Sequence, residues 1–384
     1  MQILEFHAKL RFVFLPQREG VNDEFFDNVW GRFPPEMRYN MDQVPLPFVV
    51  EQERTFTSHD DAHVHIRSCG ADGLTKRQYT MHIFVNAGEG QDGVCYVELI
   101  ARGQGQRLSQ VEKAGWHPLV SPVLFQKCAW VDRPTMLIIA KKFCIKKRER
   151  HGNRRVLLFA DNLDAHCWEE VLNEFARANV LVVFVVPGCT DAIQPIDAGI
   201  GRSIRIYIGQ ELDTWLMIND NLDKWEKGFT ASERRVMMTN LLARAVTKVQ
   251  GDDSLRVKCF ERTGCLLRLT ADMEHDAKVK PQGLKLPYSI PASLPDHLLH
   301  LQQSSRPAEI HVPDETLPSS SIEENETDAI HDNATTDNAV TTVELTSAFV
   351  DRCSSLVIEM LGDISDDMIE LATYMFTHIE EANQ

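Results

Sequence analysis

Two apolar runs separated by an amphipathic segment constrain the fold of this chain most strongly. Val156–Ala160 and Val180–Val186 are continuous apolar stretches, as expected for strands that are buried on both faces. Between them, apolar residues recur with the spacing of one helical face. These residues are Trp168, Val171, Leu172 and Phe175. The pattern predicts a parallel βαβ unit of about 30 residues.

Shorter apolar segments before this unit predict an antiparallel meander. They are separated by the turn-forming sequences Asp72-Gly73 and Gly88-Glu89-Gly90. The expected strands are residues 37–41, 63–67, 79–86 and 94–100. Three of these antiparallel strands, followed by a βαβ extension and a helix, form the ribonuclease-H-like arrangement. We therefore predict an α/β fold with a ribonuclease-H-like mixed sheet and surrounding helices.

Amphipathic segments predict the helices around this sheet. Apolar residues between Val131 and Phe143 follow one helical face, and those from Ile200 to Trp215 do the same. Thr230-Ala-Ser-Glu233 is a capping box, in which each of the two outer side chains accepts a hydrogen bond from the other residue's backbone N–H. This box predicts a helix that continues to about Lys248.

The net charge of −16 comes from the end of the chain. Residues 301–384 hold 18 acidic side chains and only two basic ones, Arg306 and Arg352. Residues 1–300 hold 38 side chains of each sign, so a phosphate-binding face there requires local clustering of basic residues. Residues 286–343 are rich in Pro, Ser, Thr, Asn and acids, which predicts a disordered linker.

These patterns divide the chain into five expected segments. A partial lead-in at 1–36 precedes the ribonuclease-H-like core at 37–218, and a helical extension follows at 219–285. The acidic disordered linker at 286–343 then leads to short C-terminal helices at 344–384.

The composition argues against a membrane or secreted protein. The longest apolar run, Val180–Val186, is too short to cross a bilayer. The first residues include His7, Lys9 and Arg11, which do not suit a signal peptide. Nine cysteines occur without a Cys-x-x-Cys pair, which predicts reduced thiols in a cytosolic or nuclear protein.

Three aspartates are the strongest candidates for a functional site. Asp42 and Asp161 each follow an expected strand, and Asp197 opens the helix that continues past Ile200. Carboxylates at the carboxyl ends of strands point into the crevice where α/β sheets bind ligands. Such a set can hold two hard divalent cations, Mg²⁺ or Mn²⁺, which cut phosphodiesters by in-line displacement. A lone aspartate after a strand is more commonly a helix cap or turn residue, so the prediction depends on all three together.

Two sequence elements around these aspartates carry a family resemblance. Asp161-Asn-Leu-Asp-Ala-His166 is similar to an Asp-Asn-x-x-x-His element, and 185–199 is similar to a Leu-Pro-Pro-x-x-Thr-x-x-x-Gln-Pro-Leu-Asp-x-Gly element. Both belong to the DDE superfamily of endonucleases and transposases, in its pogo, Tigger and centromere-protein-B-like branch. The segments 97–105 and 259–264 also look family-like, and the resemblance covers roughly residues 37–285.

The resemblance implies a transposon-derived DNA endonuclease and strand transferase. Asp42 and Asp161 would bridge or flank two Mg²⁺ (or Mn²⁺) ions, and Asp197 would complete the coordination of one of them. Water would first cut the transposon end, and the freed 3′-hydroxyl would then attack target DNA without a covalent protein–DNA intermediate. The implied partners are DNA, as transposon ends and target, and a second copy in a homodimer, with no membrane. The implied location is the nucleus.

Two residues match auxiliary positions of the family. Asn162 and His166 occupy the places of its helper residues, and their alternative role is to start the following helix. The match is imperfect beside the first aspartate, where Gln43 stands in place of the family's glutamate and removes an auxiliary acid.

Basic residues supply candidates for DNA contacts. Arg202 and Arg205 lie one helical turn apart just after Asp197 and would neutralise phosphates there. The densest basic run, residues 141–150, is a candidate for phosphate contact or nuclear import, and its alternative role is a solvated surface. From this run we select Lys146, Lys147 and Arg148.

Family members carry two helix-turn-helix domains ahead of the catalytic part, whereas about 40 residues precede Asp42 here. We therefore expect that the chain is a fragment or a degraded copy of a family member, or that another protein or domain directs it to its DNA sites. The rival functions are a catalytically inactive, domesticated or truncated DNA-binding or protein-interaction derivative, and a pure interaction protein that uses the acidic tail.

Overall fold

A six-stranded mixed sheet forms the centre of the computed structural model, which describes residues 2–15, 26–47, 77–284 and 290. The strand order is β4-β3-β2-β1-β5-β6. The strands are β1 (Arg38–Pro47), β2 (Arg77–Asn86), β3 (Cys95–Arg102), β4 (Leu124–Gln126), β5 (Val156–Ala160) and β6 (Val180–Phe184).

The pairing of the strands confirms the ribonuclease-H-like prediction. β1, β2 and β3 form an antiparallel meander, and β5 and β6 extend it in parallel from the β1 side. β4 adds a short parallel edge beside β3, which the sequence did not predict. The strand expected at 63–67 lies outside the described residues.

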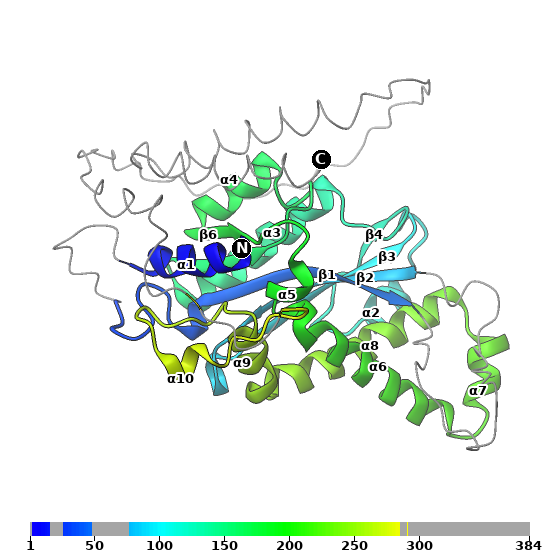
Figure 1. Cartoon of the computed structure of the whole chain (residues 1–384). Coiled ribbons are helices and arrows are strands. Elements are labelled where there is room, and N and C mark those ends of the chain that lie inside the picture. The colour runs from blue at the N-terminus through cyan, green and yellow to red at the C-terminus, as the bar shows by residue number, and fades with distance from the viewer. Residues whose placement is uncertain (1, 16–25, 48–76, 285–289, 291–384) are drawn as a thin grey trace, which may run out of the picture. The chain divides into compact units, whose positions relative to one another are not determined.

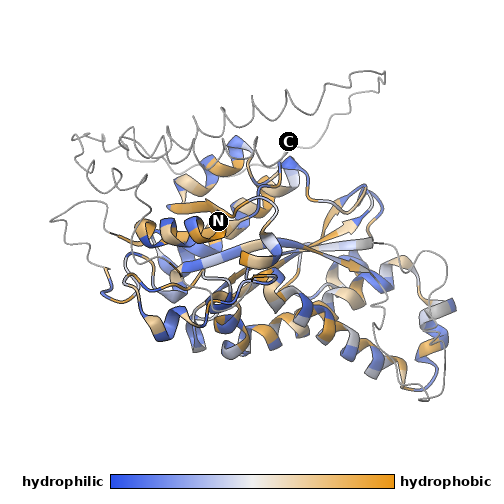
Figure 2. Cartoon of the chain, viewed as in Figure 1, coloured by the Kyte–Doolittle hydropathy of each residue, from blue (hydrophilic) through white to orange (hydrophobic). Residues whose placement is uncertain are grey.

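The strand that carries Asp42 and the strand that precedes Asp161 differ in hydropathy. β5 is fully buried along its length, as its apolar run predicts. β1 alternates polar and apolar residues, because Arg38, Asn40 and Asp42 lie on one face of the sheet and Tyr39 and Met41 on the other. Figure 2 shows β6 as hydrophobic, whereas β1 is hydrophilic to neutral over much of its length.

Helices cover both faces of this sheet (Figure 1). α3 and α4 lie on one side, and α6, α8 and α9 lie on the other. The helices are α1 (Gln2–Phe14), α2 (Gln110–Gly115), α3 (Arg133–His151), α4 (Glu169–Arg177), α5 (Thr190–Ile193), α6 (Gly201–Leu216), α7 (Asn221–Asp223), α8 (Ala231–Gly251), α9 (Asp253–Arg262) and α10 (Met273–Asp276). Short 3₁₀ helices are η1 (Pro35–Met37) and η2 (Gly90–Asp92), and π-helical turns are η3 (Ile196–Ile200) and η4 (Lys224–Gly228).

Local capping explains where the longer helices begin. The Thr230 hydroxyl accepts a hydrogen bond from the Glu233 backbone N–H, and the Glu233 carboxylate accepts one from the Thr230 backbone N–H. The predicted capping box is therefore confirmed at the start of α8. Asp132 caps α3 in a similar way by accepting from the Thr135 backbone N–H at 3.0 Å.

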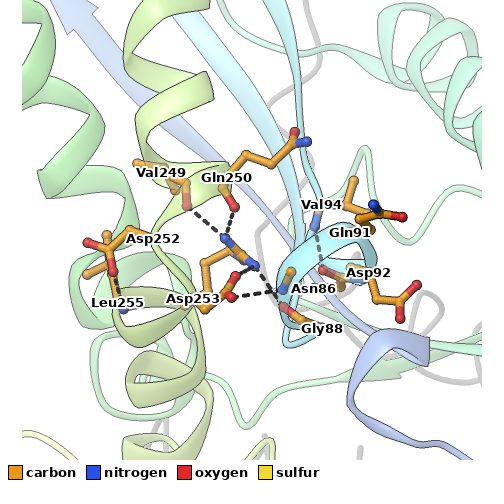
Figure 3. A network of polar contacts seen from close by, with 12 residues as sticks. Asn86, Gly88, Gln91, Asp92, Val94, Val249, Gln250, Asp252, Asp253 and Leu255 are labelled. Atoms are coloured by element: carbon orange, nitrogen blue, oxygen red, sulfur yellow. Dashed lines mark hydrogen bonds and ion pairs between the residues drawn. The ribbon is translucent and has the colours of Figure 1, made fainter.

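The helical extension is tied to the sheet by a buried arginine. Arg256 of α9 donates to the carbonyl oxygens of Val249 at 2.9 Å and Gly88 at 2.7 Å, and it pairs with Asp253 at 2.6 Å. Figure 3 shows this network between the end of α8 and the turn that joins β2 to β3. A Cβ atom at Gly93 would lie 1.8 Å from the Arg256 guanidinium, so a side chain at this position would displace the arginine from its partners. The expected core at 37–218 and the expected helical extension at 219–285 therefore pack on the same sheet.

A second buried arginine lies at the start of β1, at the same end of the sheet as the turn that joins β2 to β3. The Arg38 guanidinium donates to four backbone carbonyl oxygens and lies 3.9 Å from the centroid of the Phe14 ring. Those carbonyl groups belong to Trp30, Phe33, Cys265 and Leu267. Arg38 thus joins α1, the lead-in and the segment after α9 to the strand that carries Asp42.

The helix α1 buries a histidine whose neutrality makes the fold sensitive to acid. His7 Nε2 lies 2.8 Å from the Thr263 carbonyl oxygen, and burial lowers the pKa of His7 to about 4. The unfolded chain takes up this proton near pH 6.5 and the folded chain only near pH 4, so stability falls as pH drops through that window. We expect His7 to account for a loss of up to about 3 kcal/mol. Urea unfolding at pH 7 and pH 4.5 should show a smaller pH-dependent loss for His7→Gln than for the wild type, and equal losses would contradict the assignment.

The expected linker at 286–343 and the expected C-terminal helices at 344–384 lie outside the described residues. Among the residues that the structure describes, no helix combines the length and apolar character needed to span a membrane. The seven cysteines in the same part of the chain are all free thiols.

Candidate active site

Asp42 lies in the middle of a strand rather than at its end. β1 continues through Pro47, whereas we expected the strand to end at residue 41. The prediction of a strand end is therefore wrong, because β1 pairs with β2 from Tyr39 through Asp42 to Pro47. Its pairing with the shorter β5 is recorded only from Arg38 to Asn40. Asp42 thus lies beyond that pairing, on the side of the sheet where β5 ends, and its side chain is only 7% exposed.

Asp161 follows β5 directly and is held by a buried histidine. Its carboxylate Oδ1 forms a short hydrogen bond with Nδ1 of His166, whose side chain is fully buried. Burial opposes ionisation of Asp161, but the hydrogen bond and charge of His166 and the Leu163 backbone N–H outweigh it and lower the pKa of Asp161. His166 therefore keeps Asp161 ionised and fixes its orientation.

Asp197 lies on the turn η3 that precedes α6. Gly199 in this turn has a φ of 158° and interrupts the helical path, which only glycine does without strain. Gly201 then packs against β1, where a Cβ atom would lie 2.9 Å from Val44 Cγ2. This close approach brings η3 to the face of β1 that carries Asp42. It is reinforced by the Ile196 backbone N–H, which donates to the Asn40 side chain at 2.9 Å.

The structure brings the three predicted aspartates together. Burial, and then the charges of Asp197 and Asp161, raise the pKa of Asp42 well above its usual value. The pKa of Asp197 is also raised, first by desolvation and then by the charges of Asp191 and Asp161, although Asp197 is on the exposed rim. A hydrogen bond links the Asp42 and Asp197 carboxyl groups. The site therefore concentrates negative charge that its own hydrogen bonds offset only in part.

Gln194 is a site residue that our sequence prediction missed. Its side chain is fully buried and lies between the aspartates. In the orientation that satisfies both ends of its amide, Oε1 accepts from the Asp161 backbone N–H at 2.9 Å. Its Nε2 then lies 3.3 Å from Oδ2 of Asp42 and 3.3 Å from Oδ2 of Asp197. The only sequence signal was its place three residues before Asp197 in the Gln-Pro-Ile-Asp element.

The donor atoms present suit a hard divalent cation. Carboxylate and carboxamide oxygens are the ligands that Mg²⁺ prefers, and the raised pKa of Asp42 marks a position that a cation would favour. In the part of the chain that the structure describes, no three His, Cys, Asp or Glu side chains are arranged to hold a metal ion. Asp161 is turned toward His166, and the Gln194 amide lies between the other two carboxylates.

The two auxiliary candidates lie on either side of Asp161. Asn162 donates through Nδ2 to the Val185 carbonyl oxygen at 2.6 Å and joins the ends of β5 and β6. His166 Nε2 lies 3.5 Å from Nε2 of Gln43, the residue that stands in place of the expected glutamate. Neither residue starts α4, whose N-cap is Trp168, so the alternative role as helix starters is wrong.

Of the two arginines that follow Asp197, Arg205 lies close to that carboxyl group. Arg202 is exposed on the first turn of α6. Arg205 is half-buried, and its charge lies close enough to Asp197 to oppose the rise in the pKa of that carboxyl. The role of both arginines in DNA binding stays a prediction.

The basic run of α3 divides into buried and exposed members. Lys147 is buried and donates to the Ala178 carbonyl oxygen at 2.8 Å, so it is not placed to contact DNA as we expected. Lys146 is half-buried, pairs with Glu98 at 3.4 Å and lies over the Tyr96 ring. Arg148 is exposed and donates to the Arg177 carbonyl oxygen at 3.3 Å. Of the three selected residues, only Arg148 has the exposure that a phosphate contact needs.

Comparison with solved structures finds similar folds at low sequence identity. A Mos1 transposase paired-end complex with left transposon end aligns at 13% identity and a TM-score of 0.35, covering 68% of this chain and 62% of that chain. The alignment thus spans less than two thirds of that transposase chain. The catalytic domain of Mos1 mariner transposase aligns at 13% identity and a TM-score of 0.28, covering 66% of this chain and 94% of that domain. A comparison with curated proteins finds no match.

A family model supplies the remaining comparison. The model of the DDE superfamily endonucleases, DDE_1, matches residues 99–246. The matched segment begins after Asp42 and includes Asp161, Gln194 and Asp197. The pogo, Tigger and centromere-protein-B-like branch stays a prediction. Residues 99–246 of this chain are thus similar to the DDE superfamily of endonucleases.

Proposed function

We propose that the chain is a transposon-derived DNA endonuclease and strand transferase whose site is formed by Asp42, Asp161 and Asp197. The observation that supports it most is that these carboxylates lie close together where β1 continues beyond the end of β5. Three carboxylates that had no ligand would only destabilise the folded chain, because like charges held together repel. An oxygen-rich site that concentrates negative charge is suited to binding cations.

The residues of this chain have distinct parts in the proposed reaction. Asp42 and Asp161 would hold two Mg²⁺ or Mn²⁺ ions between them, and Asp197 would complete the site of one ion. Such ions, when bound, activate water and stabilise the leaving oxygen of a phosphodiester. His166 keeps Asp161 ionised and oriented, and Asn162 fixes the loop that carries it. Arg205 and Arg202 would face the DNA phosphates next to Asp197.

The proposed chemistry has two steps in one site. Water first attacks a phosphodiester at the transposon end, which breaks one P–O bond and frees a 3′-hydroxyl. That hydroxyl then attacks a phosphodiester of target DNA and displaces a second 3′-oxygen. Neither step needs a protein nucleophile, so no covalent protein–DNA intermediate forms. We further propose that the chain acts in the nucleus and as a homodimer.

Plasmid nicking tests the proposal directly. Wild-type protein should nick supercoiled DNA with Mg²⁺ or Mn²⁺ and should stop when EDTA is added. Binding of Mn²⁺ without nicking would favour the inactive derivative. Protein that neither binds Mn²⁺ nor nicks DNA would refute the proposal.

The two arginines of α6 give a separate prediction about DNA binding. Replacing Arg202 or Arg205 with alanine removes one phosphate contact and should reduce the slope of log affinity against log salt by about 1. Fluorescence anisotropy over a range of salt concentrations measures this slope. Lys147→Met provides a contrast, because its buried ammonium should leave the slope unchanged. Equal slopes for Arg202→Ala, Arg205→Ala and wild type would place the DNA elsewhere.

A further inference from the structure

Gln194 connects all three aspartates through one neutral side chain. It directly follows α5, and its backbone N–H donates to the Thr190 carbonyl oxygen at 2.8 Å. The adjacent Pro195 leads into η3, so the backbone on both sides of Gln194 is constrained. Its amide then reaches the backbone of Asp161 with one end and the carboxyl groups of Asp42 and Asp197 with the other.

The position of the amide nitrogen is unusual for a neutral group. Two acidic side chains, one of them almost fully buried, converge on a single NH₂ group. Its two N–H bonds carry only partial positive charge, so they balance the carboxyl groups incompletely. Both contacts are 3.3 Å long, beyond the usual range for N–H···O hydrogen bonds, so they are weak. A fully charged cation in the same place would interact with both carboxylates far more strongly.

We propose that Gln194 is a positioning residue that occupies the place of a cation between Asp42 and Asp197 while the site is free of metal. This inference rests on the proposed function. It explains how the chain keeps the Asp42 and Asp197 carboxyl groups together when no metal is bound. The Nε2 group gives up both hydrogen bonds when a divalent cation binds. The bond from the Asp161 backbone N–H to Oε1 fixes the other end of the amide. Asp42 and Asp197 are thereby kept close to the backbone of Asp161 at a small cost in metal affinity.

Replacing Gln194 with methionine tests this role, because the side chain keeps a similar length and loses its donors. The melting temperature in EDTA should fall, since Asp42, Asp197 and the Asp161 N–H each lose a partner. Mn²⁺ affinity, measured by titration calorimetry, should rise roughly three- to tenfold, the equivalent of about one hydrogen bond that no longer competes. Unchanged or weaker Mn²⁺ binding by Gln194→Met would overturn the proposal.

A matched control separates this effect from a general loss of stability. The Gln126 side chain accepts hydrogen bonds from the backbone N–H groups of Cys128 and Trp130, away from the aspartates. Gln126→Met should lower the melting temperature without changing Mn²⁺ affinity. An equal rise in Mn²⁺ affinity for both variants would also overturn the proposal.

A second substitution covers the case in which Gln194→Met does not fold. Gln194→Lys places a permanent ammonium near the same carboxylates, so it should raise the melting temperature in EDTA and weaken Mn²⁺ binding more than tenfold. A lysine variant with wild-type Mn²⁺ affinity would contradict the proposal. Wild-type protein that binds no Mn²⁺ would instead refute the proposed function, and this inference with it. Wild-type binding combined with a failed Gln194 prediction would refute the inference alone.

Discussion

Replacing Asp42 with asparagine should abolish metal-dependent nicking and raise the stability of the metal-free protein at neutral pH. The loss of nicking should be on the order of a thousandfold or more, because ion binding supplies several kcal/mol of transition-state stabilisation. The gain in stability follows from the raised pKa of Asp42, which is caused by burial and by the charges of Asp197 and Asp161. An asparagine at this position removes a charge that the fold disfavours.

The pH dependence of this gain has a definite sign. The folded chain binds the Asp42 proton more tightly than the unfolded chain, whose aspartates have a pKa of roughly 4. The contribution of Asp42 to stability is therefore present below that value and is lost as pH rises through the raised folded pKa. Urea unfolding in EDTA should show Asp42→Asn more stable than wild type at pH 7, with the difference shrinking toward pH 4. An Asp42→Asn protein that nicks at the wild-type rate would falsify the site assignment.

Asp161→Asn should also stop nicking, but with the opposite effect on stability. A general expectation for clustered carboxylates is that removing one charge leaves stability intact. The structure departs from it at this residue, because His166 holds Asp161 as a favoured anion and its pKa is lowered. Losing this charge-assisted bond should cost roughly 1–3 kcal/mol, and calorimetric melting in EDTA measures it. Equal shifts of the melting temperature for Asp42→Asn and Asp161→Asn would mean that His166 does not stabilise the Asp161 carboxylate.

The largest expected loss of stability comes from Arg38→Met. This change leaves three buried carbonyl groups and one part-buried carbonyl group without their donor and removes the guanidinium from the Phe14 ring. At about 1–3 kcal/mol for each buried group left unpaired, the loss exceeds roughly 4 kcal/mol and approaches the stability of a whole domain. We expect Arg38→Met to be unfolded or aggregated by circular dichroism and gel filtration.

A nearby arginine gives the control for this prediction. Arg32 makes an exposed 3.5 Å contact with the Leu15 carbonyl oxygen and lies 5.1 Å from the Phe33 ring centroid. Arg32→Met should therefore change the free energy of unfolding by about 1 kcal/mol or less. A folded Arg38→Met protein with stability equal to Arg32→Met would show that the Arg38 contacts contribute little.

Local patterns in the sequence predicted most of the elements, because periodicity and capping act over a few residues. The βαβ unit from Val156 to Phe184 and the capping box at Thr230 were found where they were expected. β4 was not predicted, because three residues at a sheet edge carry too little pattern to distinguish them from a loop.

Contacts between distant segments decided what the sequence could not show. The polar residues after Met41 suggested a strand end, but pairing with β2 carries β1 through Asp42 to Pro47. Lys147 sits in a uniformly basic run, and only the packing of α3 against α4 shows that it is buried. Gln194 acts between three separate elements, so no short stretch of sequence contains its surroundings.

The contacts of Arg38 also limit how far this protein can fold while it is being synthesised on the ribosome. Its carbonyl partners at Cys265 and Leu267 lie 227 and 229 residues further along the chain. The strand with Asp42 therefore emerges early, but its supporting contacts are complete only after the segment beyond α9 has been made. A nascent chain that stalls before Cys265 already contains all three aspartates and lacks the contacts that fix β1. Late closure of this kind couples the assembly of the proposed active site to the synthesis of nearly all of the described residues.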